Sequence, residues 1–145
     1  MDWRVESTAK VLEALKLVYN AAIGGRNAFC AFEVREEGAQ IIPYVQCLAN
    51  AEHREMLCEA VSAISQPPLA SWLTEDRVAI LSQLGFQPPA PNDADLPNFY
   101  QFLSPDGADG LQRIAALLIE VLQRVYDYAG APPLNISCSL PGVIF

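Results

Sequence analysis

The residues on which most catalytic and metal chemistry depends are scarce in this chain. Its 145 residues include one histidine and four cysteines, and none of the cysteines forms a Cys-x-x-Cys pair. The single histidine, His53, excludes a metal site with two histidines from one chain, and the cysteine spacing is not that of a zinc motif. Gly24-Gly25 lacks the lysine and Ser/Thr that follow the glycines of a phosphate-binding loop. We therefore expect no cofactor, no metal site and no enzymatic activity.

Positive charge is scarce too. Nine lysines and arginines stand against 17 acidic residues, which gives a net charge of −8. A chain of this charge is repelled by nucleic acid and by anionic lipid, and its acidity either keeps an apolar protein soluble or complements a basic partner. We expect a protein that binds neither nucleic acid nor membrane.

Long hydrophobic runs are missing as well. The longest, residues 114–122, is interrupted by Glu120 and is shorter than the roughly 20 residues that cross a bilayer. The start of the chain carries Glu6, Lys10 and Glu13, which does not fit the apolar core of a signal peptide. We expect a cytoplasmic protein whose four cysteines are reduced and mostly buried.

Core-forming residues, by contrast, are abundant. Hydrophobic residues make up 52% of the chain and charged residues 18%. The length is close to the commonest domain size, and a domain this long needs no disulfide or metal to fold. We predict that residues 1–145 form a single domain.

Apolar periodicity and cap residues divide the chain into helices and strands. We predict a first helix capped by Ser7 or Thr8 and ended by Gly24-Gly25, followed by helices at 51–64, 75–84 and about 110–128. Strands are predicted at 29–34, 41–48, 98–103 and 134–140, the first two forming a hairpin. The predicted fold class is α+β, with a mainly antiparallel sheet of about four to five strands and three to four helices.

The predicted internal strands carry apolar side chains on both sides. In the first strand, the side chain of Phe29 points to the side opposite those of Cys30 and Phe32. In the third strand, the side chain of Phe102 points to the side opposite that of Leu103. A sheet face exposed to water is normally polar at alternate positions. Two arrangements satisfy this pattern: helices cover both faces, or they cover one face and leave the other for a second copy or a client protein.

Three pieces of sequence occur in an order that is found in a known family. They are Glu59-Ala60-Val61-Ser62, Leu84-Gly85-Phe86-Gln87-Pro88-Pro89 and Pro97-Asn98-Phe99-Tyr100, the last preceding a long apolar helix. This ordered set resembles the bacterial domains related to type III secretion chaperones and YbjN, also called TY-Chap domains. The resemblance covers residues 28–128 approximately.

Two residues depart from the family pattern. Phe86 stands where tryptophan is usual, which is a tolerable exchange for an apolar anchor. Ala63 stands where asparagine is usual, so any cap or turn that the asparagine makes is lost in this chain.

The resemblance implies a secretion-chaperone-like fold and a non-catalytic role in binding protein or peptide, as a chaperone or an adaptor. It also implies a homodimer that holds an extended client segment along apolar grooves and strand edges. Two alternatives remain open at this point: a small-molecule-binding module and a structural subunit of a larger assembly.

Three aromatic residues are the candidates for contact with a partner. Trp72 lies in a connector that follows two prolines, where a large aromatic residue often anchors an interface, although the commoner role of such a residue is a lid over the core, here beside Leu69 and Leu73. Tyr100 is the second candidate, unless it only satisfies its hydroxyl at the rim of the core. Trp3 is the third.

Overall fold

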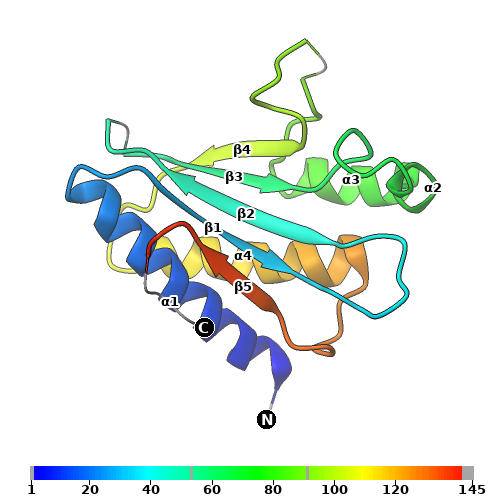
Figure 1. Ribbon diagram of the computed structural model, residues 1–145, viewed down its shortest axis with the longest axis horizontal. Helices are drawn as coiled ribbons and strands as arrows, with labels where there is room; N and C mark the ends of the chain where they lie inside the picture. Colours follow the sequence, from blue (N-terminus) through cyan, green and yellow to red (C-terminus); the bar gives the residue numbers. More distant parts are fainter. Residues whose placement is uncertain (1, 53, 91, 142–145) are drawn as a thin grey trace.

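The chain folds into a single antiparallel sheet with helices on one of its faces (Figure 1). The computed structural model describes residues 2–52, 54–90 and 92–141. The sheet has the strand order β4-β3-β2-β1-β5, and all its pairs are antiparallel, which confirms the predicted α+β class. The elements follow the order α1 (Trp3–Ile23), β1 (Ala28–Glu33), β2 (Tyr44–Ala49), β3 (Met56–Ala60), α2 (Leu69–Trp72), α3 (Glu75–Gln83), β4 (Phe99–Leu103), α4 (Gly110–Tyr126) and β5 (Asn135–Cys138).

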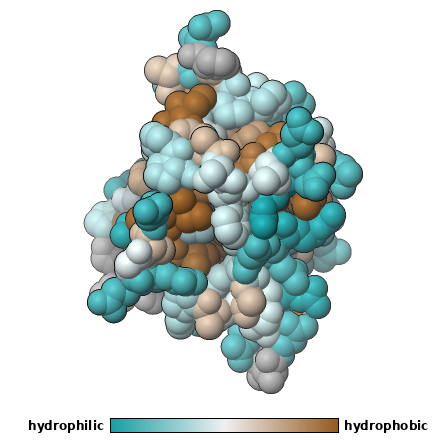
Figure 2. Space-filling view, turned by 90° about the vertical axis from the view of Figure 1, so that its right-hand side faces the viewer, coloured by the Kyte–Doolittle hydropathy of each residue, from teal (hydrophilic) through white to brown (hydrophobic). Residues whose placement is uncertain are grey.

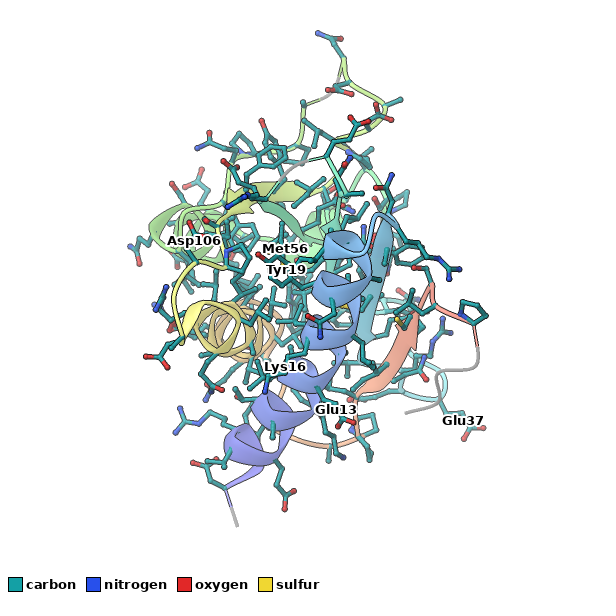
Figure 3. All side chains as sticks on the ribbon, turned by 90° about the vertical axis from the view of Figure 1, so that its left-hand side faces the viewer. Glu13, Lys16, Tyr19, Glu37, Met56 and Asp106 are labelled. Carbon is teal, nitrogen blue, oxygen red and sulfur yellow. The ribbon has the colours of Figure 1, made fainter. Side chains whose placement is uncertain are left out.

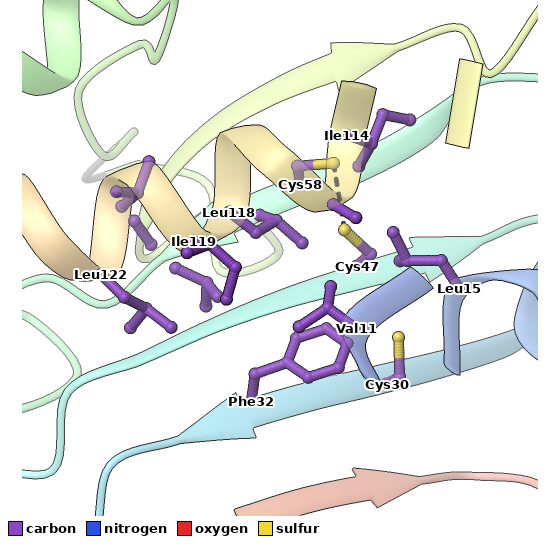
Figure 4. Close-up of a cluster of buried hydrophobic side chains, with 14 of the residues drawn as sticks. Val11, Leu15, Cys30, Phe32, Cys47, Cys58, Ile114, Leu118, Ile119 and Leu122 are labelled. Carbon is purple, nitrogen blue, oxygen red and sulfur yellow. Dashed lines mark hydrogen bonds between the residues drawn. The ribbon is translucent and has the colours of Figure 1, made fainter. Parts of the chain in front are cut away.

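The hydrophobic core lies between the sheet and helices α1 and α4, which pack against each other at an angle on one face (Figure 3). Helix α1 contributes Val11 and Leu15 to this core, and α4 contributes Leu118 and Leu122; all four are fully buried. Figure 4 shows these side chains meeting those of the strands beneath them. We call this the covered face of the sheet and the opposite side the open face. Alternation along each strand decides which residues belong to which face.

Helix α1 begins earlier than the sequence indicated. Its N-cap is Asp2, whose side chain accepts a hydrogen bond from the Arg4 backbone nitrogen at 2.9 Å. The expected cap residues, Ser7 and Thr8, lie inside the helix. Asp2 is an equally good cap residue, and the additional turn brings Trp3 against Tyr128, with ring centroids 5.2 Å apart.

The predicted helix at 51–64 is wrong, because this segment forms a turn followed by strand β3. The Asn50 side chain accepts from the Glu52 backbone nitrogen at 2.8 Å, as a helix cap would. However, Asn27 binds the Ala51 nitrogen at 2.8 Å, and the chain turns back as a hairpin. Strand β3 then pairs with β2 on one side and β4 on the other. A short apolar run cannot be assigned to helix or strand by periodicity alone.

The other predicted helices and strands agree with the structure within a few residues, whereas the short helix α2 was predicted as a connector. Strand β2 begins at Tyr44, directly after Pro43, which has no backbone N–H to donate to the sheet. Thr74 caps α3 and Gly85 follows it at φ 95°, as predicted. His53 lies outside the described residues. Within the described ranges, no helix combines the length and apolar character needed to cross a membrane.

Candidate functional site

Four apolar side chains form one continuous row across the open face of the sheet. Phe29 of β1 faces Leu48 of β2, Leu48 faces Leu57 of β3, and Leu57 faces Phe102 of β4. Directly opposed residues on an antiparallel sheet have Cβ atoms about 5 Å apart, so the four side chains adjoin. The two ends of the row reach solvent, with Phe29 43% exposed and Phe102 55% exposed. We call these four residues the apolar row.

A hollow of about 550 Å³ lies at the β3–β4 end of the apolar row. Leu48, Leu57 and Phe102 supply its apolar wall. Its polar rim comes from the loop between β2 and β3, through Asn50, Arg54 and Glu55. A concave apolar surface with a polar rim is the usual form of a binding site.

Beside the apolar row lies a hydrogen-bonded polar cluster centred on the buried side chain of Asn98. Its Oδ1 accepts from the Ser62 backbone nitrogen at 3.1 Å and from the Ser65 hydroxyl at 2.6 Å. Its Nδ2 donates to the Tyr44 hydroxyl at 3.1 Å and lies 3.5 Å from Glu59 Oε1. Every polar group of this side chain therefore has a partner, which fixes the junction between β3 and β4.

Glu59 is the one buried acidic residue among those described, at 3% exposure. Its Oε2 accepts a hydrogen bond from Gln46 Nε2 at 2.9 Å. Burial raises the pKa of the Glu59 carboxyl above its ordinary value, while the hydrogen bonds from Gln46 and Asn98 oppose that rise. With so little exposed surface, this carboxyl serves as an acceptor within the cluster and not as a contact for a partner.

The sequence pieces that carry the family resemblance meet at this cluster. Ser62 Oγ donates to the Pro97 carbonyl at 2.5 Å, which joins the first piece to the third. Gln87 pairs with Tyr100 through two backbone hydrogen bonds of 2.7 and 3.1 Å, which joins the second to the third. Phe86 is buried, as expected of an apolar anchor. The pieces thus build the frame that holds β3 and β4, although the first of them ends a strand and not a helix.

Trp72, at the end of α2, is engaged by the C-terminus of α4. Its indole Nε1 donates to the Val125 carbonyl at 3.1 Å, and the Arg77 guanidinium lies over its ring, 4.2 Å from the centroid. Arg77 also donates to the Val125 carbonyl at 2.6 Å and binds both carboxylate oxygens of Asp127 at 2.9 Å. This ion pair lowers the pKa of Asp127. A half-buried Trp72 thus satisfies the helix end, and its contact with a partner stays a prediction.

The three aromatic candidates lie on different elements and do not form one site. Trp3 packs edge-on against Tyr128 near the start of α1. Tyr100 lies on the open face, next to Phe102, with ring centroids 6.2 Å apart. Tyr100 is therefore the candidate that borders the apolar row, and its role and that of Trp3 toward a partner stay predictions.

Sequence reasoning did not select the residues of the apolar row. Part of the signal was present in the sequence, because Phe29 was assigned to the side opposite Cys30 and Phe32, and Phe102 to the side opposite Leu103. Leu57 was assigned to a helix, and without it the row has a gap in the middle. The neighbours across the sheet also depend on strand order, which the sequence does not state.

Elsewhere on the molecule, the apolar surface is interrupted by charged and polar side chains. An open groove of about 1260 Å³ runs between α1 and α4, and we call it the interhelical groove. Its lining mixes charged side chains such as Arg4, Arg113 and Glu120 with apolar ones such as Leu12 and Leu117. The end of the molecule that carries α2 and α3 shows apolar atoms in separate patches among polar side chains (Figure 2). In the described parts of the chain, His, Cys, Asp and Glu side chains do not gather into a group that could hold a metal ion.

Comparison with known proteins gives one family match. The model of the TY-Chap3 family, described as "T3SS (YopN, CesT) and YbjN peptide-binding chaperone 3", matches residues 9–134. The match extends beyond both ends of the resemblance found in the sequence and confirms it. No curated protein and no solved structure matched the chain.

Proposed function

Because the matched model spans most of its length, the chain belongs to the TY-Chap3 family of peptide-binding chaperones, and we propose that it binds extended segments of client proteins on the open face of its sheet. The observation that carries this proposal is the apolar row, whose four members adjoin on a sheet face opposite the helices. The client's apolar side chains would pack on Leu48 and Leu57 and enter the hollow beside Phe102. In this proposal, residues 1–145 form one peptide-binding domain.

The edge of β4 supports binding of an extended segment. Gln87 occupies this edge at Tyr100. Phe102 is two residues further along, so its backbone N–H and C=O point to the same side as those of Tyr100, away from β3. Within the described residues, no strand pairs with β4 at that position. A client strand added there would place its side chains beside Phe102, at the mouth of the hollow.

Composition supports a choice of client and location. The net charge of −8 favours segments that carry basic residues between their apolar ones. The thiols of the buried cysteines are free, which suits a reducing compartment, and we place the protein in the cytoplasm of a bacterium. The role in this proposal is non-catalytic, because the row and the hollow present apolar side chains to the client.

The substitution Phe102→Ser tests the site. Removing the most exposed aromatic ring of the row leaves a client without its apolar contact, and loss of such an anchor weakens binding by about tenfold or more. The measurement is the dissociation constant, by fluorescence anisotropy, of a labelled basic peptide with alternating leucine residues.

Ile23→Ser is the matched control. Ile23 is a large apolar residue, 69% exposed, at the end of α1 and away from the open face. Its loss removes a similar apolar surface and should leave the dissociation constant unchanged. If both substitutions weakened peptide binding equally, or if neither weakened it, the open face would be refuted as the client site.

We also propose that the protein forms a homodimer. An uncovered row of apolar side chains is a surface that a second copy can bury in the absence of client. Light scattering at micromolar concentration should give twice the chain mass of 15.8 kDa. A mass of 15.8 kDa under these conditions rejects the dimer and leaves client binding to be judged by the Phe102 experiment.

A further inference from the structure

All four cysteines of the chain lie in a single row across four adjacent strands. Cys138 of β5 faces Cys30 of β1, Cys30 faces Cys47 of β2, and Cys47 faces Cys58 of β3. Their side chains belong to the covered face, where Cys30, Cys47 and Cys58 point into the core (Figure 4). Although these residues are far apart in the sequence, the register of the sheet makes each one the neighbour of the next.

The hydrogen-bond pattern divides this row into two close pairs. The Phe29 backbone bonds toward β5, with its carbonyl accepting from the Ser139 nitrogen at 3.0 Å. Since alternate residues bond to opposite sides, Cys30 and Cys138 form a pair without mutual backbone hydrogen bonds. Such pairs have Cα atoms about 4.5 Å apart, within the range that a disulfide spans.

The second pair, Cys47 and Cys58, has the same arrangement. The Val61 nitrogen bonds to the Tyr44 carbonyl at 3.1 Å. Since the backbone hydrogen bonds between β2 and β3 recur at every second residue from there, Cys47 and Cys58 make none to each other. The two sulfur atoms are 3.1 Å apart. Both residues are fully buried, so a reagent in solution does not reach them in the folded chain.

Access to solvent distinguishes the two pairs. Cys138 is partly exposed on β5, which is an edge strand, while Cys30 on the neighbouring strand β1 is buried. Burial raises the pKa of the Cys30 thiol, and the neighbouring Cys138 adds to that rise. A small disulfide in solution reaches the partly exposed Cys138 and not the buried Cys30, so the first reaction belongs to Cys138.

We propose that Cys138 and Cys30 form a dithiol site that reduces low-molecular-weight disulfides. The Cys138 thiolate attacks one sulfur of the small disulfide, forms a mixed disulfide and releases the first small thiolate. Cys30 then loses its proton and attacks the Cys138 sulfur, so that the Cys30–Cys138 bond forms as the bond to the second small thiol breaks. Two electrons pass to the small disulfide, and the two protons of the dithiol end on the two released thiols. The bond would fasten β5 to β1, and this site is independent of client binding.

Oxidised glutathione is the probe for this site. The folded chain is incubated with it, and the product is analysed by intact mass and by peptide mapping without reduction. We expect the loss of two hydrogen masses and a bond between Cys30 and Cys138. Cys138→Ser should abolish the reaction, Cys30→Ala should stop it at a glutathione adduct on Cys138, and Cys58→Ala should leave it intact.

Three results would overturn the proposal. They are a lack of reaction in the unmodified chain, a glutathione adduct on Cys138 that persists while Cys30 is present, and a bond that maps to Cys47 and Cys58. Circular dichroism before and after oxidation establishes that each product formed in the folded protein. Cys138→Ser is the variant best suited to folding, because its side chain is partly exposed at the sheet edge.

Discussion

At the scale of single residues, the side chains that mark the family serve the framework of the site. Asn98, Ser62 and Glu59 satisfy one another and the backbone between β3 and β4. A buried polar group that loses its partner costs more than the hydrogen bond itself contributes. These three residues, none more than 3% exposed, therefore hold the strands that carry Leu57 and Phe102.

Asn98→Ala tests this framework role. The substitution leaves the Ser62 amide and the Ser65 hydroxyl without their acceptor, and the Tyr44 hydroxyl without its donor. We expect the free energy of unfolding to fall by about 2–3 kcal/mol, as is usual for unpaired buried polar groups. Urea denaturation followed by circular dichroism measures the change.

Asn92→Ala is the control for this measurement. Asn92 is exposed in the loop before β4, and exposed substitutions of this kind change stability by about 0.5 kcal/mol or less. If Asn98→Ala were as mild as Asn92→Ala, the polar cluster would not be the frame of the β3–β4 junction.

At the scale of secondary structure, the sequence predicted the faces of the strands and the size of the sheet, but it assigned one strand segment to a helix. The assignment of Phe29 and of Phe102 to the side opposite the core positions is confirmed, because alternation along a strand is strict. The segment 51–64 was predicted as a helix because Asn50 resembles a cap and the apolar residues after it recur at helical spacing. Pairing with β2 and β4 outweighs that local preference.

The candidate site depends on neighbours that no local pattern specifies. The apolar row requires the strand order β4-β3-β2-β1, and the row of four cysteines requires β5 to return beside β1. Both follow from long connections, through α2 and α3 in one case and through α4 in the other. The family resemblance identified the pieces that meet at the polar cluster, but apolar periodicity had placed Glu59 on a helix.

At the scale of the whole molecule, the important feature is the asymmetry of its two sheet faces. Helices α1 and α4 pack on the covered face and bury the core residues of β1, β2 and β3. The open face keeps an apolar row with exposed ends at Phe29 and Phe102. A sheet whose second face carries a continuous apolar row is typical of a protein that binds another chain there.

Mapping the client by nuclear magnetic resonance tests this central claim most directly. Isotope-labelled protein is titrated with a basic peptide that carries alternating leucines, and the backbone amide shifts are followed. We predict that the largest changes fall on Phe102, Leu57, Leu48 and Phe29. Changes confined to the interhelical groove between α1 and α4, with the apolar row unaffected, would contradict it.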